Sequence, residues 1–243
     1  FANMGCASSL PTTWIDVCDG THTTPEKQVS IQKLYYFEDF WGRKSALEFM
    51  MDYKGIPFEV QTINAIAYYT MGIKKKMGGL PVAERADGGL MNETHPIARY
   101  IARHNGLYPA NPVEAYWNDR IAMAYDPIVN GTFKWILAMG NEKKELYTKL
   151  HDETMPQCLK SVAEHFREGK WMVGDGSKIY MCDFFWGRVY TDYIANPKSF
   201  VQPAHREAIL AGCPGFKSFG DKFMKEHQNW IKKREALGQK YIV

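Results

Sequence analysis

The sequence predicts an α/β unit that begins near residue 31, followed by an all-helical part that begins at residue 112. Three observations support this fold class. Runs rich in β-branched and aromatic residues alternate with segments of helical period between residues 31 and 104. The stretch 109–112 holds two prolines and an asparagine, which is typical of a linker. Beyond this linker the pattern is helical and contains no convincing strand.

The first unit has the predicted order β-α-β, then β-β-α. The last two strands form a hairpin across the turn signal Asp87-Gly88. The first helix ends at the glycine of Lys54-Gly55, and Thr94 is placed as the N-cap of the second. The strands are predicted at 31–37, 58–63, 81–85 and 89–91, and the helices at 45–53 and 96–104.

The helical part begins with a strong start signal. Asn111 is placed as the N-cap, Pro112 at the first helical position and Glu114 in the first turn. Glycine and proline signals then separate the helices. The helices are predicted at 112–139, 142–168, 183–195, 203–211 and 215–227.

Composition excludes several classes of protein. Lys and Arg number 30 and Asp and Glu 27, so a net charge of +3 does not indicate nucleic-acid binding. The longest apolar runs are a few residues, far short of the roughly 18 that a membrane span needs. Five scattered cysteines without a CxxC pattern predict no disulfide framework and no metal site. They fit a reducing compartment, so we expect a cytoplasmic protein.

Residues 1–30 are predicted to be a flexible extension, because they carry turn and coil residues without a period. The segment Met4-Gly5-Cys6-Ala7-Ser8-Ser9 fits the myristoylation pattern, with Cys6 placed for a second acyl chain. Three residues precede Met4, and an internal glycine cannot be acylated. Tethering to a membrane surface is therefore expected only if Met4 is the true start, and otherwise the segment is a plain tail.

Several short motifs follow one another in order. They are Lys33-Leu34-Tyr35-Tyr36-Phe37, Gly42-Arg43, Gly55-Ile56-Pro57-Phe58-Glu59, Leu80-Pro81-Val82, the segment from Ile97 to Arg103, and Glu114 to Asp119. Together they resemble the cytosolic glutathione S-transferases, closest to the sigma class, over about 31–228. The resemblance implies a thioredoxin-like, glutathione-binding domain over 31–108 and an all-helical domain over 112–243. It also implies a homodimer and a pocket for the electrophile in the helical domain.

Tyr36 matches the catalytic tyrosine of this family. Its hydroxyl would donate a hydrogen bond to the sulfur of glutathione and favour the thiolate, which is the nucleophile. Because neighbouring strand residues point to opposite faces, Tyr35 and Tyr36 cannot both face the thiol. The resemblance implies that further residues bind glutathione, namely Arg43, Tyr68, Gly78, Gly79, Leu80, Pro81, Glu93, Thr94 and Asp119.

Three of these matches imply specific contacts. The Leu80-Pro81 peptide, expected to be cis, would pair with the cysteinyl main chain of glutathione. The helix start at Glu93-Thr94 would bind the γ-glutamyl carboxylate, since a helix N-terminus favours an anion. Asp119 would reach the ligand's ammonium across the dimer; the alternative is a solvated helix face.

The sequence also departs from the family pattern. The segment between Tyr36 and Arg43 is one residue longer than in the family. Tyr68 and Gly72 stand where the sigma class has tryptophan and lysine, and the nearby lysine run 74–76 is a candidate substitute. Tyr180 stands where a Ser or Thr caps a helix in the family, and a tyrosine cannot cap in that way.

Two functions are consistent with these observations. The first is a detoxifying transferase that conjugates glutathione with, or uses it to isomerise, small apolar electrophiles. Its partners would be glutathione as co-substrate, a small hydrophobic electrophile and a second copy of the chain. The alternative is a non-catalytic, transferase-like scaffold protein within a larger assembly, with protein partners instead.

Overall fold

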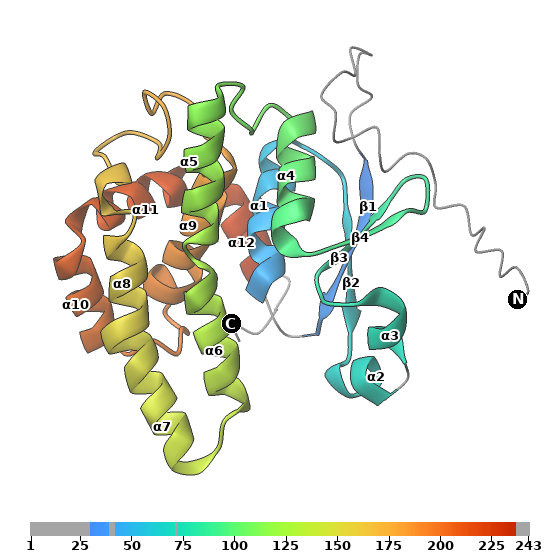
Figure 1. Cartoon of the computed structure of the whole chain (residues 1–243), viewed down its shortest axis with the longest axis horizontal. Coiled ribbons are helices and arrows are strands. Elements are labelled where there is room, and N and C mark those ends of the chain that lie inside the picture. Colours follow the sequence, from blue (N-terminus) through green and yellow to red (C-terminus); the bar gives the residue numbers. More distant parts are fainter. Residues whose placement is uncertain (1–29, 39–41, 71, 237–243) are drawn as a thin grey trace, which may run out of the picture.

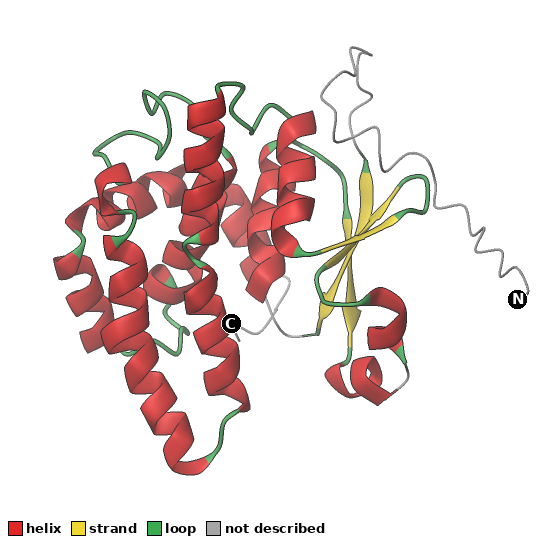
Figure 2. Ribbon diagram, in the orientation of Figure 1, coloured by secondary structure: helices red, strands yellow, loops and turns green. Residues whose placement is uncertain are grey.

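The computed structural model describes residues 30–38, 42–70 and 72–236 of the 243-residue chain. A single sheet lies at one side of the molecule, and helices make up the rest (Figures 1 and 2). The predicted extension 1–30, its acylation pattern and the longer segment after Tyr36 fall almost wholly outside the described residues. The predicted domain limits at 108 and 112 stay predictions.

The sheet has four strands in the order β2-β1-β3-β4. Strands β1 and β2 are parallel, and the other two pairs are antiparallel. The register of β1 shifts between Ile31 and Lys33, which explains why Ile31, Leu34 and Tyr36 are all buried. The strands are β1 (Ile31–Phe37), β2 (Glu59–Ile63), β3 (Val82–Arg85) and β4 (Leu90–Asn92).

Two helices stand between the sheet and the helical part, α1 (Ser45–Tyr53) and α4 (Thr94–His104) (Figure 1). Thr94 is the first residue of α4, so its prediction as the N-cap is wrong. The preceding residue, Glu93, has a φ of 69° and makes no side-chain cap. Two short helices that the sequence did not indicate, α2 (Ala65–Thr70) and α3 (Ile73–Met77), lie on the other side of the sheet.

The helical part contains no strand in its described residues 112–236, as predicted. Short 3₁₀ segments η2 (Gly42–Lys44) and η4 (Ala163–His165) and π-helical segments η3 (Lys149–Thr154) and η5 (Tyr190–Ala195) join or extend helices. The helices of this part are α5 (Pro112–Met123), α6 (Asp126–Leu137), α7 (Gly140–Thr148), α8 (Met155–Lys160), α9 (Met181–Val189), α10 (Pro203–Gly212), α11 (Pro214–Glu226) and α12 (Gln228–Ala236).

The start of α5 is confirmed. The Asn111 side chain accepts hydrogen bonds from the N–H groups of Val113 and Glu114, at 2.9 and 3.2 Å. Other predicted bounds are wrong. The segment 112–139 forms two helices, α5 and α6, and not one. Within 142–168 the last α-helix, α8, ends at Lys160. Helix α12 was not predicted.

Helix α9 is the centre of the core. All nine of its residues are buried, and it packs against α1, α4, α5 and α11. At its start, the Asp183 carboxylate accepts N–H groups of Tyr180 and Met172, at 2.8 and 2.9 Å. Tyr180 makes no side-chain cap, as predicted. Helices α1 and α9 therefore hold the sheet and the helical part together beside the end of β1.

Candidate functional site

Tyr36 lies near the end of β1, at the boundary between the sheet and the helical part. Its hydroxyl oxygen accepts the backbone N–H of Arg43 at 2.9 Å. Gly42 packs on the same hydroxyl, because a Cβ atom at Gly42 would lie 2.2 Å from it. Among the hydrogen bonds of the described residues, none uses the Tyr36 O–H as donor. This O–H can therefore donate to a ligand.

The surroundings of Tyr36 keep its hydroxyl protonated. The side chain is 1% exposed, and this burial raises its pKa to about 12 against the lowering effect of the Arg43 N–H and of the charges on Arg188 and Arg43. A hydroxyl of this kind acts as a donor at neutral pH and not as a base. A sulfur atom reaches it only if the residues around it move.

Tyr35 points to the other face of the sheet, as the alternation of strand residues predicts. Its hydroxyl donates to the Glu84 carboxylate. This hydrogen bond is the largest cause that raises the pKa of Tyr35 to about 12. Tyr35 is therefore engaged in the sheet and separated from the Tyr36 hydroxyl.

Arg43 joins η2 to α6. Its guanidinium donates to Asp126 at 3.2 Å and to Asn130 at 2.6 Å, and its side chain stays 21% exposed. Asp126 also bonds His95 of α4 at 3.1 Å. Partial burial acts to raise the pKa of Asp126, but His95 and Arg43 together hold it below its usual value.

The loop before β3 meets the loop before α4. The Leu80-Pro81 peptide is cis, as predicted. A Cβ atom at Gly79 would lie 3.8 Å from the Glu93 carboxylate, and one at Gly78 would lie 2.8 Å from the Asn92 amide. Thr94 follows at the start of α4, with its side chain buried. These predicted residues therefore gather at one end of the sheet, where β3 begins and β4 ends.

Tyr68 lies at the same end of the sheet. Its hydroxyl donates to the backbone oxygen of Gly78, and its ring packs on that of Phe37 with centroids 5.1 Å apart. Lys74 lies over the ring of Tyr69, 5.3 Å from its centroid. Tyr68 therefore supports the glycine loop.

Asp119 has partners within its own chain. It pairs with Arg99 at 3.0 Å and accepts the Tyr108 hydroxyl at 2.8 Å. No hydrogen bond or ion pair of the described residues joins it to the other predicted glutathione residues. Its role toward the ligand stays a prediction.

Sequence analysis missed several residues of this region. Tyr125 and Arg188 are buried near Tyr36, and Asp126, Asn130 and Asp192 hold the segment that follows it. They come from α6, α9, η5 and the turn between α5 and α6. A signal was present in part, since an arginine and an aspartate inside a strongly apolar helix are rarely buried without a partner.

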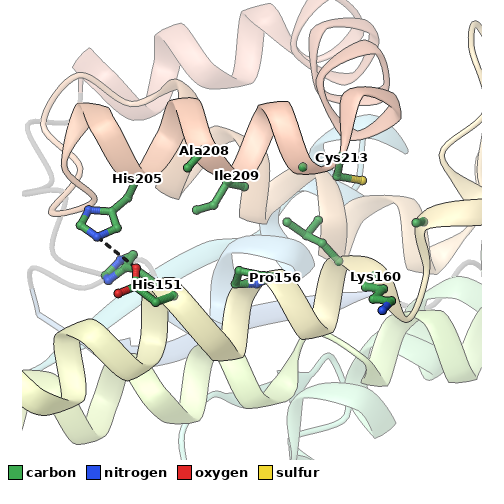
Figure 3. A pocket seen from close by; sticks show the side chains of 11 residues that line it. His151, Pro156, Lys160, His205, Ala208, Ile209 and Cys213 are labelled. Carbon is green, nitrogen blue, oxygen red and sulfur yellow. Dashed lines mark ion pairs between the residues drawn. The ribbon is translucent and has the colours of Figure 1, made fainter.

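A cavity of about 540 Å³ lies elsewhere, between η3–α8 and α10 (Figure 3). His151 and His205 stand at one end, and Lys160 and Cys213 at the other. His205 pairs with Asp152 at 3.3 Å. None of the predicted site residues lines this cavity.

The described residues contain no group of three or more His, Cys, Asp or Glu arranged to hold a metal ion. No helix within 30–38, 42–70 and 72–236 is long and apolar enough to cross a membrane.

Known proteins resemble this chain in sequence and in fold. No protein-family model matches the sequence. The chain is 27% identical over 154 residues to hematopoietic prostaglandin D synthase of Gallus gallus, covering 63% of this chain and 75% of that protein. It is 23% identical over 155 residues to the class-mu 28 kDa glutathione S-transferase isozyme of Schistosoma japonicum, covering 62% and 75%. The solved prostaglandin synthase D of Nilaparvata lugens matches with a TM-score of 0.67 and 25% identity, over 83% of this chain and 97% of that one.

The chain is similar in sequence and fold to glutathione S-transferases. The resemblance expected from the motifs is confirmed, and so is the fold of a thioredoxin-like sheet unit followed by an all-helical part. The similarity extends over most of the length of each of these proteins, so it includes both the sheet and the helical part.

Proposed function

We propose that this protein is an enzyme that uses glutathione, either conjugating its thiolate with small apolar electrophiles or isomerising such compounds with it. The observation that carries the proposal is the match to relatives named as glutathione transferase and prostaglandin D synthase, over both parts of the fold. The described residues that resemble a glutathione site also lie at one end of the sheet.

In this proposal Tyr36 donates its free O–H to the glutathione sulfur. A hydrogen bond to a charged group contributes about 1.5–3 kcal/mol, which lowers a thiol pKa by roughly 1–2 units. The Tyr36 oxygen accepts the Arg43 N–H through one of its lone pairs, so the O–H points in another direction. Arg43, Tyr68, Gly78, Gly79, Leu80, Pro81, Glu93 and Thr94 would then bind the peptide part of glutathione.

A homodimer belongs to the proposal. Helix α5 carries large apolar side chains that are 53–65% exposed, namely Val113, Tyr116 and Met123. A stripe of this kind is typical of an interface. Asp119 on the same helix would serve the partner's ligand. We further propose a cytoplasmic detoxifying role and sigma-class membership, the latter from the motif spacing.

The scaffold alternative is not favoured, because the relatives are named as enzymes. The two functions separate in one experiment. The protein is passed over glutathione resin and then assayed with glutathione and chlorodinitrobenzene. We expect retention, elution by free glutathione and formation of the conjugate above the uncatalysed rate. A protein that neither binds the resin nor accelerates conjugation contradicts the proposal.

A pair of variants tests the role of the tyrosine. Tyr36→Phe removes one oxygen and keeps the ring, so we expect the glutathione KM to change little. We expect conjugation at neutral pH to fall about 10- to 150-fold, the equivalent of losing ~1.5–3 kcal/mol of thiolate stabilisation. Tyr35→Phe is the matched control and should be mild. An impaired Tyr35→Phe beside a normal Tyr36→Phe would contradict the assignment.

A further inference from the structure

We propose that Asp192 is a positioning residue for Tyr36, which it holds in place through Ser45 and the η2 turn. The inference rests on the proposed function, because it concerns how the same hydroxyl is fixed. Asp192 lies in η5 of the helical part, whereas Ser45 is the first residue of α1. No motif in the sequence links the two residues.

The first step is the contact between Ser45 and Asp192. The Ser45 hydroxyl donates to an Asp192 oxygen at 3.1 Å, and both side chains are buried. Ser45 directly follows η2, whose Arg43 N–H donates to the Tyr36 oxygen. Ser45 is two residues after Arg43 in the chain. A shift of the Ser45 backbone would therefore also move the Arg43 N–H, which holds the Tyr36 hydroxyl.

The second step is that Asp192 itself cannot move easily. Its carboxylate accepts from Arg188 at 3.0 Å, from Arg234 at 3.3 Å and from the Thr191 hydroxyl at 3.2 Å. Arg234 also donates to Ser45 at 2.6 Å. These side chains are buried, and a buried charge that loses its partner is costly. The carboxylate is therefore a rigid anchor for the turn.

The third step concerns the other attachments of the turn. The Arg43 side chain is tied to Asp126 and Asn130, but this tether reaches the turn through a long, partly exposed side chain. The buried Lys44 side chain of the turn pairs with Glu48 of α1, so this contact stays within the sheet unit and does not reach the helical part. The hydrogen bond to Asp192, by contrast, comes from the short side chain of Ser45, the residue that directly follows the turn. The charged groups that act on the Tyr36 hydroxyl are Arg43 and Arg188, and Tyr193 and Tyr125 are further titratable neighbours. Both arginines act to lower the pKa of Tyr36 against burial.

The consequence is a separation of roles. Ser45 and Asp192 make no predicted glutathione contact, so loosening their link leaves binding intact. It misplaces the hydroxyl that stabilises the thiolate, and small misplacements of catalytic groups cost as much as 10²-fold in rate. A kcat effect without a KM effect is the expected signature.

The test compares Ser45→Ala with Thr191→Val. Both remove one buried hydroxyl that bonds Asp192, and each removes one further contact, with Arg234 for Ser45 and with the Arg188 backbone oxygen for Thr191. Only Ser45 directly follows the turn. Chlorodinitrobenzene conjugation is followed against pH, and hydrogen exchange of the amides in 42–45 is followed without substrate. For Ser45→Ala we expect kcat to fall about tenfold, the apparent thiol pKa to rise by about one unit and these amides to exchange faster. Thr191→Val should match wild type in all three.

Two results of this comparison would overturn the inference. Ser45→Ala with a wild-type pH profile and wild-type exchange overturns the inference. Equal changes in both variants also overturn it, since they would report a general loosening of the helical core. If wild-type protein does not conjugate glutathione, the proposed function fails, while the exchange measurement still decides whether Asp192 holds the turn. We exclude Asp192→Asn as the main variant because it leaves two buried arginines short of a charge.

Discussion

The Tyr36 hydroxyl has two separate hydrogen-bonding capacities. Its oxygen is held by the Arg43 N–H, and its proton is retained because burial raises its pKa to about 12. In a site of low polarity, a hydrogen bond to an anion is stronger than it is in water. The arrangement suits a donor to a thiolate, and it depends on Gly42, where a side chain would collide with the hydroxyl.

Glu93 is the only described residue other than glycine with a positive φ, at 69°. Such a conformation costs about 1–3 kcal/mol and is common at ligand sites. Glu93→Gly removes both the strain and the carboxylate, whereas Glu93→Ala removes only the carboxylate. We expect Glu93→Gly to be more stable than Glu93→Ala by about 1 kcal/mol in urea unfolding.

Both Glu93 variants should bind glutathione more weakly than wild type in calorimetry, because both lack the side chain of a residue that is proposed to bind the peptide part of glutathione. Equal unfolding free energies for the two variants would show that the backbone at Glu93 stores no strain. Unchanged affinity would remove Glu93 from the glutathione site.

At the scale of elements, the sequence predicted those strands, helices and turns that depend on neighbouring residues alone. The four strands, α1, the hairpin turn and the Asn111 cap follow from residue period and turn residues. The break between α5 and α6 was missed although it has a local signal: a proline inside a helical pattern ends or kinks the helix, and Pro127 lies in the first turn of α6. Helix α12 is highly charged, and it is anchored by the buried residues Trp230 and Arg234. Its helix depends on tertiary packing, which the sequence pattern does not show.

The crossing of α9 and α11 gives a prediction about packing. A Cβ atom at Gly187 would lie 2.4 Å from the Phe223 ring, so Gly187→Ala overpacks the core. We expect its unfolding free energy to fall by about 1–3 kcal/mol. Gly212→Ala, in α10 with nothing within 4 Å, is the control and should be neutral or stabilising. Equal effects in denaturant unfolding would refute the close crossing.

At the scale of the whole molecule, the candidate site joins two parts that are far apart in the sequence. Tyr36 and Arg43 were predicted from motifs, whereas Asp126 and Asp192 were not. Their contacts with the η2 turn depend on how the helical part packs against α1, and no periodicity encodes such a long-range pairing. The predicted residues match short motifs in the sequence, whereas the missed ones contact the segment beside Tyr36 from distant parts of the chain.

The stability of the molecule should fall in mild acid. Burial lowers the pKa of His227 and of His151 to about 4, below the usual 6.5. Between these values the unfolded chain binds protons that the folded chain does not, so each histidine lowers stability by up to about 3 kcal/mol as pH drops from 6.5 to 4. Burial raises the pKa of Asp183 to about 7, which acts in the opposite direction.

A single variant isolates the histidine contribution. His227 is surrounded by the rings of Phe49, Phe184 and Phe223, so His227→Phe should fit. We expect urea unfolding of the variant to lose less stability than wild type between pH 6.5 and 4. Identical pH dependence in the two proteins would show that His227 is not buried in its neutral form.

The most direct test of the account is the ionisation of bound glutathione. The ultraviolet absorption of the thiolate is titrated in the binary complex of wild type and of Tyr36→Phe. We predict an apparent thiol pKa about 1–2 units below the free value of about 8.5 in wild type, and a return toward the free value in Tyr36→Phe. A bound thiol that titrates like free glutathione in wild type, or one that is unaffected by Tyr36→Phe, would contradict the assignment of Tyr36 as the thiol donor.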